Sequence, residues 1–357
     1  MPDSIYCTCR IALSCNKCGK AMKNRDATKR VINALSKDKR PDLANVFGNG
    51  PLLLSDIPAS AKENNADGPS SSSPPEVAIG IDEAGRGSVL GPMVYGMAYW
   101  NVAVEAENKI PKDFNDSKQL KEEDRDRLFD AILQNEDIGF AMRSLLPSEI
   151  SRNMLRTYPY NLNEMSHDSA MVMIRKLLDE GVPVRQAFID TVGNPSSYKR
   201  KLEREFPGID FTVESKADAK YAPCSAASVV AKVMRDRFAA QWKFSEVSEQ
   251  DEQSNKALLN YGSGYPSDPK CKEWMEKNTL RDSVFGYSDI LRFSWAPSKK
   301  QLEENAVPVV FEADLDEEDE DIQQQKQGMA GFLKGDKKRK RLPYFEKRNI
   351  RVTKLIC

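Results

Sequence analysis

Four acidic residues stand at or just past the ends of apolar stretches in this sequence. Asp82 and Glu83 follow the apolar run at residues 77–81, Asp190 closes "QAFID", and Asp218 lies beyond "DFTVE". Successive side chains of a strand point to opposite faces of its sheet, and an unpaired charge in a core is costly. We therefore expect the first strand to end at Asp82, or a cation to lie beside it.

Carboxylates at the ends of several strands have a specific chemical use. Strand ends in an α/β sheet meet at one edge, where ligands bind. Converging carboxylates repel one another unless divalent cations neutralise them, and oxygen-only ligands suit Mg²⁺ or Mn²⁺. Two such ions can cleave a phosphodiester, because one activates water and the other stabilises the leaving oxygen. The alternative is that each Asp only begins a turn.

The composition restricts the chemistry further. The chain has 357 residues and one histidine, His167, which excludes a histidine acid–base pair and a histidine-rich metal site. Its 53 basic and 54 acidic residues nearly cancel but are segregated into blocks. The seven cysteines, four of them within residues 7–18, fit a reducing compartment better than a disulfide scaffold. No apolar run is long enough to span a membrane.

Hydrophobic periodicity places the acids on an α/β unit. Apolar runs predict strands at 77–81, 93–100, 138–145, 186–193 and 210–221. Helical spacing predicts helices at 121–133, 165–178 and 225–242, the last with Ser225 as N-cap, and a tight loop "YGSGYPSDP" at 261–269. This order predicts a mixed central sheet flanked by helices, within a folded unit of residues 76–297.

A glycine-rich turn follows the first acidic pair. Gly80, Gly85 and Gly87 invite comparison with a dinucleotide-binding loop, but the G-x-G-x-x-G spacing is absent. Acids within such a turn would also repel a pyrophosphate. Two glycines around Arg86 do let backbone N–H groups approach an anion or a ribose closely.

Seven motifs then occur in one order: "GIDEAGRGSVLGPMVYG", "NDSKQL", "YNLNEMSHD", "FIDTVG", "KADAKY…SAASVVAKV", "YGSGYPSDP" and "LRFSW". In this order they are similar to the motifs of type 2 ribonuclease H, the ribonuclease HII family, and most closely to those of its eukaryotic catalytic subunit. The resemblance covers residues 76–297. It implies a ribonuclease H-like fold and two-metal cleavage of the RNA strand in RNA–DNA hybrids. It also implies nicking 5′ of single ribonucleotides in duplex DNA, which leaves a 3′-hydroxyl and a 5′-phosphate.

The resemblance also assigns roles to single residues. It implies that two divalent ions, Mg²⁺ or Mn²⁺, are bound by Asp82, Glu83, Asp190 and Asp218. The ribose 2′-hydroxyl, which distinguishes RNA from DNA, would be contacted by Gly85, Arg86 and Gly87. Tyr265 would pack on the sugar at the RNA–DNA junction. Phosphate contacts would come from Ser117, Lys118 and Asn163.

Two nearby residues depart from these roles. Ser88 stands where the family usually has proline, which would have fixed the exit from the turn. We expect a slightly looser grip on the ribose without loss of activity. His167, in "NEMSHD", is interpreted as structural, because the two-metal scheme needs no imidazole.

The segments outside the catalytic unit are predicted to be mostly disordered extensions, residues 1–75 and 298–357. Cys7, Cys9, Cys15 and Cys18 could hold Zn²⁺, but only five residues separate the two pairs, which favours ordinary reduced cysteines. The linker at 63–76 is rich in serine and proline.

The C-terminal extension carries candidate partner signals. "KKRKR" at 337–341 predicts a nuclear localisation signal, the alternative being a solvated charge run. "MAGFL" at 329–333 has the apolar spacing of a sliding-clamp peptide, but Lys326 stands where glutamine belongs. Residues 298–311 could contact accessory subunits, since the resemblance implies a heterotrimer with two of them.

Two rival functions are compatible with parts of the pattern. Another nuclease of the same fold, such as a resolvase or integrase, would have no 2′-hydroxyl to read, so the turn at Arg86 and Tyr265 argues against it. A non-catalytic hybrid-binding scaffold would not need four converging carboxylates. The sequence therefore favours a nuclear, divalent-metal-dependent endoribonuclease with roles in ribonucleotide removal and RNA primer removal during DNA replication.

Overall fold

The computed structural model describes residues 52–62 and 75–305, except 112–113, 115–119, 157, 245–252, 254–255, 257 and 279–287. The cysteine pairs at 7–18, the clamp-like segment and the basic run at 337–341 lie outside this part of the chain. None of the described helices is long and apolar enough to cross a bilayer.

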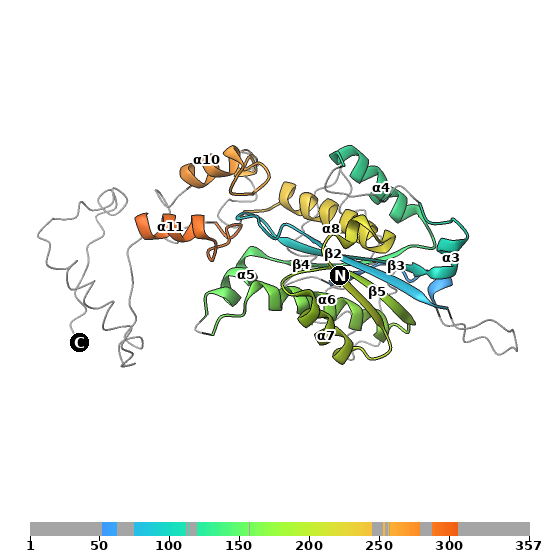
Figure 1. Ribbon diagram of the computed structural model, residues 1–357. Helices are drawn as coiled ribbons and strands as arrows, with labels where there is room; N and C mark the ends of the chain where they lie inside the picture. Colours follow the sequence, from blue (N-terminus) through green and yellow to red (C-terminus); the bar gives the residue numbers. More distant parts are fainter. Residues whose placement is uncertain are drawn as a thin grey trace, which may run out of the picture.

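A six-stranded mixed sheet forms the centre of the protein (Figure 1). Its strands stand in the order β1-β4-β3-β2-β5-β6. The antiparallel half contains β1 (Leu52–Leu54), β4 (Gly139–Leu145), β3 (Met93–Asn101) and β2 (Val77–Ala84). In the other half, β5 (Val184–Asp190) and β6 (Asp210–Glu214) run parallel to β2. The predicted mixed sheet is confirmed.

Helices cover both faces of this sheet, because β2 and β3 are apolar on both sides. On one face, α8 (Ala222–Ala240) and α4 (Glu122–Gln134) enclose a cluster that includes Trp100 and Phe129. The opposite face packs on α6 (Leu162–Asp179) and α7 (Pro195–Glu205), with α5 (Pro147–Met154) beside them. Figure 1 shows α4 and α8 above the sheet and α5, α6 and α7 below it.

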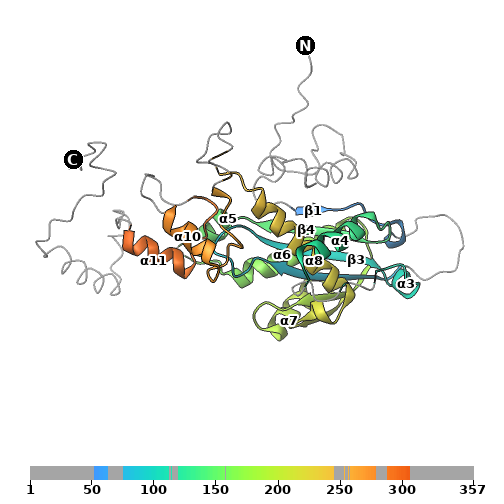
Figure 2. The ribbon, with the colours of Figure 1, turned by 90° about the horizontal axis from the view of Figure 1, so that it is seen from above.

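A third apolar cluster lies beyond the end of β2. There α10 (Pro269–Lys277) packs through Trp274 and Met275 against Val89, Leu90 and the end of α8. The helix α11 (Ala296–Asn305) follows, and both helices lie at the same end of the sheet in Figure 2. Short elements complete the fold: η1 (Ala59–Ala61), α3 (Val102–Ala106) and η2 (Ala217–Ala219).

Several boundaries differ from the sequence predictions. Strand β2 continues through both acids to Ala84, so the expectation that it ends at Asp82 is wrong; its last residues stay paired with β3, Glu83 opposite Tyr95. Strand β6 stops at Glu214, and Asp218 lies in the separate turn η2.

The start of α8 and the start of the fold also differ. Helix α8 begins at Ala222 with Pro223 in its first turn, and Ser225 does not cap it, because its hydroxyl donates to the carbonyl of Phe114 at 2.6 Å. The sequence prediction places residues 52–62 in the N-terminal extension. They belong to the fold instead, since β1 pairs with β4 and Leu54 is buried in the core.

Candidate active site

The carboxylates of two neighbouring strands lie at the same edge of the sheet. β2 and β5 are parallel and pair up to Ile81 and Ile189, so Asp82 and Asp190 are the next residues on each strand. The loop after β6 returns to this edge, where Lys216 and Ala217 donate their N–H groups to Asp190 Oδ1 at 2.8 and 3.4 Å. These bonds fix η2, and with it Asp218, beside Asp190.

The N-terminus of α8 closes this edge on one face. Gly80 allows the close approach, because a Cβ there would lie about 2.0 Å from the backbone of Pro223. Buried Cys224 donates its thiol to the carbonyl of Ile81 at 3.3 Å. Burial raises the pKa of Cys224 well above its ordinary value, and the charges of Asp82, Asp190 and Asp218 raise it further.

One thiol therefore feels three of the four predicted carboxylates, which places Asp82, Asp190 and Asp218 around a single point. Asp82 and Asp218 are themselves buried. The positive end of the α8 dipole partly offsets this concentration of negative charge, by about 0.3–1 kcal/mol for each favourable interaction.

Glu83 lies on the other face, as its place on a continuous strand requires. It is the cross-strand neighbour of Tyr95. Burial raises the pKa of Tyr95 and of Tyr198, and in both cases the Glu83 charge is the next contribution. The structure thus brings three acids together on the α8 side and holds the fourth on the α6 side of the same strand end.

The donor chemistry of this edge fits a hard divalent cation, because the converging groups are carboxylates and the single nearby sulfur is held as a buried thiol. Within the described ranges, no three Asp, Glu, His or Cys side chains already form a metal-binding set. Coordination by these acids would therefore require their side chains to rotate inward. Their assignment as metal ligands stays a prediction.

The turn that follows β2 is held from inside the protein. Gly85 has a φ of +84°, and a Cβ there would lie 2.6 Å from the carbonyl of Pro92. Ser88 is buried and donates its hydroxyl to Gly85 O at 2.9 Å and its N–H at 3.4 Å. Ser88 therefore closes the turn with bonds that a proline could not make.

Arg292, from the motif "LRFSW", supports the same turn. Its guanidinium is fully buried and donates to the carbonyls of Gly85 at 2.7 Å, Arg86 at 3.0 Å and Gly91 at 3.0 Å. Burial, with smaller contributions from the charges of Arg235 and Arg86, lowers the pKa of Arg292 to about 9. The group remains cationic at neutral pH and sets the direction of three carbonyls at once.

Tyr265 faces the exposed side of this turn. A Cβ on Gly87 would lie 3.3 Å from the Tyr265 ring, so the ring and the glycine stand against each other. The segment carrying Tyr265 is fixed because Val89 and Leu90 donate their N–H groups to Gly264 O at 2.8 and 3.1 Å. Buried Arg235 lies 5.7 Å from the ring centroid and donates to Ser263 O at 2.6 Å.

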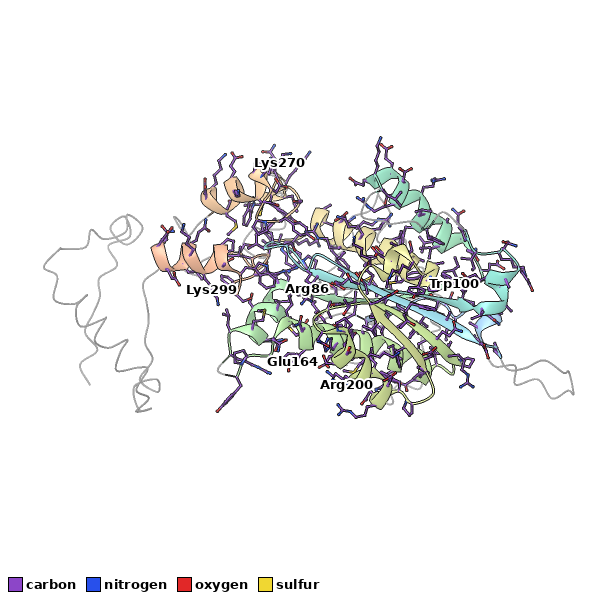
Figure 3. The ribbon with its side chains drawn as sticks, in the orientation of Figure 1. Arg86, Trp100, Glu164, Arg200, Lys270 and Lys299 are labelled. Atoms are coloured by element: carbon purple, nitrogen blue, oxygen red, sulfur yellow. The ribbon has the colours of Figure 1, made fainter. Side chains whose placement is uncertain are left out.

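The first turns of α6 hold Arg86. Its guanidinium donates to Ser166 Oγ at 2.9 Å and to Asn163 Oδ1. Because Asn163 Oδ1 is engaged by Arg86, its predicted phosphate contact would have to come from the Nδ2 amide. Figure 3 shows Arg86 near Glu164 of α6, at the opposite end of the sheet from Trp100.

His167 links α6 to the loop that carries Asp190. Its Nε2 lies 3.2 Å from Val192 O, and its ring stacks on Tyr198 at 3.8 Å between centroids. Burial lowers its pKa, with a smaller opposing contribution from the Val192 carbonyl. These contacts agree with the structural role predicted for this residue.

The structure thus groups the predicted residues unequally. It gathers Asp82, Asp190 and Asp218 at one edge, and it joins the turn 85–87 to Tyr265 and Asn163. Ser117 and Lys118 lie outside the described residues. Sequence reasoning missed the roles of Arg235, Arg292 and Ser166. A signal existed for Arg292, since "LRFSW" places a cation among apolar residues, but no local pattern shows which carbonyls it contacts.

Comparisons with known proteins agree with this arrangement. The sequence model of the family "Ribonuclease HII" matches residues 79–298. The ribonuclease H2 catalytic subunit of Rattus norvegicus is 44% identical over 243 residues, which cover 68% of this chain and 77% of that protein. The corresponding subunit of Arabidopsis thaliana is also 44% identical, over 67% and 78% of the two chains.

A solved structure shows the same fold. The ribonuclease H2 of Pyrococcus horikoshii OT3 matches with a TM-score of 0.50 and 29% identity, covering 64% of this chain and 98% of that one. Fold and site together define a nuclease with a ribonuclease H-like fold.

Within that class, the chain belongs to the ribonuclease HII family, and its similarity is to the catalytic subunit of eukaryotic ribonuclease H2. It is therefore an endoribonuclease that acts on RNA–DNA hybrids. This membership agrees with neither of the two rival functions, the resolvase or integrase and the non-catalytic hybrid-binding scaffold.

Proposed function

We propose that this chain, besides cleaving the RNA strand of RNA–DNA hybrids, nicks duplex DNA on the 5′ side of single embedded ribonucleotides. The observation that carries the proposal is the placing of Gly87 against the Tyr265 ring, 3.3 Å from a Cβ position, at the end of the strand that bears Asp82. A ribose at that point would meet backbone groups of the turn on one side and an aromatic ring on the other.

The chain's own residues account for selectivity between RNA and DNA. Arg292 fixes the carbonyls of Gly85 and Arg86, so the turn presents its polar backbone groups in one orientation. A site built to hydrogen-bond a hydroxyl rejects the analogue that lacks it, because its polar groups are then left unpaired. The 2′-hydroxyl is that group in RNA, and Tyr265 supplies a flat surface for the sugar.

Hydrolysis would depend on divalent ions, Mg²⁺ or Mn²⁺, held by Asp82, Glu83, Asp190 and Asp218. When bound, two such ions supply an activated water and stabilise the leaving oxygen, which gives a 3′-hydroxyl and a 5′-phosphate. The protein orients the acids: backbone N–H groups of Lys216 and Ala217 hold Asp190 Oδ1, and the N–H of Glu83 holds Asp82 Oδ1 at 2.7 Å.

The cellular role that follows is the removal of ribonucleotides from DNA, including RNA primers during replication. The relatives are named as one subunit of ribonuclease H2, which supports assembly of this chain with accessory subunits, and we propose a heterotrimer with two of them. The basic run at 337–341 supports a nuclear location. Contact of the segment at 329–333 with a sliding clamp, and zinc binding at Cys7, Cys9, Cys15 and Cys18, remain weaker hypotheses, because those residues lie outside the described part of the chain.

A nicking assay tests the main proposal. The substrate is duplex DNA with one ribonucleotide, cleaved in Mg²⁺ by the full chain, alone and with candidate accessory subunits. We expect a nick 5′ of the ribonucleotide that disappears in Asp190→Asn, because the amide keeps its backbone hydrogen bonds but loses the charge. Asp179→Asn, at the exposed end of α6, is the matched control and should cleave normally.

Absence of any nick with partners present, but with hybrid binding retained, would overturn the catalytic proposal. Zinc is tested separately by metal analysis of the purified chain and of Cys15→Ser and Cys18→Ser variants.

A further inference from the structure

The loop between α5 and α6 exposes two large apolar side chains. Leu155 is 51% exposed and Tyr158 is 85% exposed, far more than the aromatic residues elsewhere in the described core. Exposed arginines flank them at positions 152 and 156. The loop projects at the lower left of Figure 1, at the end of the sheet where α10 and α11 lie.

This loop is braced rather than loose. Tyr160 donates its N–H to Asn153 O at 2.9 Å, which closes the loop at its base. Arg156 donates its Nε to Tyr158 O at 2.7 Å and lies 5.4 Å from the Tyr160 ring centroid. Tyr160 in turn donates its hydroxyl to Asp168 of α6. The contacts fix the backbone of Tyr158 while its ring stays in solvent.

The loop is continuous with the part of the site that holds the turn after β2. Asn161 caps α6, and Asn163, two residues further on, accepts from Arg86. Five residues separate Tyr158 from Asn163, a span of at most about 17 Å. Along a DNA duplex this corresponds to about five base pairs at roughly 3.4 Å each.

We infer that Tyr158 and Leu155 contact the nucleic-acid duplex that flanks the cleaved ribonucleotide, within about five base pairs of it. One aromatic ring between two guanidinium groups suits a sugar–phosphate backbone, since the arginines meet phosphates and the ring meets sugars or bases. The exposed patch is too small for a stable protein interface, which needs about 800 Å² on each partner. The inference rests on the proposed placing of the ribonucleotide at residues 85–87.

The test compares Tyr158→Ala with native full chain, in the presence of its accessory subunits, on a long duplex carrying one ribonucleotide. We expect KM to rise about fivefold to tenfold, the effect of losing one aromatic contact with nucleic acid, while kcat stays within about twofold. Tyr158→Phe should keep the native KM, because the ring is retained. Val172→Ala is the matched control: Val172 is also an exposed apolar residue, 38% exposed, on α6 itself.

Shortened substrates decide whether the contact is direct. When the duplex arm that reaches the loop is cut to about three base pairs, the KM values of native protein and Tyr158→Ala should converge. A difference that persists on both shortened arms would mean that the variant acts through α6, and would overturn the inference. An unchanged KM on the long duplex, or an equal rise in Val172→Ala, would do the same.

A photo-crosslinking residue, p-benzoylphenylalanine, placed at position 158 should label a DNA strand. Labelling of an accessory protein instead would assign the loop to protein assembly and overturn the inference. If native protein nicks none of these substrates, the proposed function fails, and that outcome differs from equal nicking by native protein and variant.

Discussion

The carboxylate edge and the turn at residues 85–88 adjoin each other but are stabilised in opposite ways. At the carboxylate edge, two buried acids and Asp190 all act on one thiol, so like charges are forced together. At the turn, Gly85 O alone accepts three hydrogen bonds, from Ser88 Oγ, Ser88 N and Arg292. Chemistry is assigned to the strained region and recognition to the satisfied one, as expected where active sites sacrifice stability for function.

The largest effect should come from removing one charge at the carboxylate edge. Asp82→Asn should lower the cleavage rate by about a thousandfold, since a metal ligand contributes several kcal/mol. The same change should leave the thermal midpoint without metal unchanged or higher, because it relieves repulsion with Asp190 and Asp218. Cleavage assays and calorimetry on the same sample check both parts. A lower midpoint would show that Asp82 stabilises the fold, which would remove the contrast between the two regions.

The turn should respond in the reverse way, with a loss of stability. Arg292→Lys should lower the free energy of unfolding by about 2–3 kcal/mol, because one ammonium cannot reach three carbonyls and leaves buried acceptors unpaired. Nicking at single ribonucleotides should fall with it. Urea denaturation measures the change, and Arg200→Lys on the exposed face of α7 is the control. Equal stability of the two variants would contradict the role given to Arg292.

A smaller effect is expected at Ser88. The looser grip predicted from the absence of proline implies that Ser88→Pro tightens KM on a one-ribonucleotide duplex about twofold to fivefold, by restricting the unbound turn. Gly85 O would still accept from Arg292. The hydroxyl bond of Ser88 works against this prediction, so the measurement decides between backbone restriction and side-chain closure. An unchanged or weaker KM would favour closure.

The smallest effect concerns the pH dependence of stability. The pKa of His167 is lowered in the fold by burial. The unfolded chain therefore binds a proton first as the pH falls through about 6.5, and the free energy of unfolding decreases below that pH. Since His167 is the only histidine, His167→Gln should flatten the loss of stability between about pH 7 and pH 5. Urea titrations at several pH values check this, and an identical slope would rule out the imidazole as the cause.

The sequence by itself determined the class of fold and the identity of the acids. Apolar runs predicted β2, β3, β4 and β5 and the helices α4 and α6, because burial on both faces leaves a pattern within each segment. Strand ends carrying Asp82 and Asp190 could be expected at one edge, because parallel neighbours end together. The ordered motifs then identified the family.

Only the tertiary structure decided how these parts meet. The path of β2 through Glu83 depends on its pairing with Tyr95, and the position of Asp218 depends on hydrogen bonds from η2 to Asp190. Arg292 reaches Gly85 across 207 residues of sequence, and Tyr265 meets Gly87 only because Gly264 bonds to Val89 and Leu90. Such contacts leave no local periodicity, because they join backbone groups of segments that are distant in sequence.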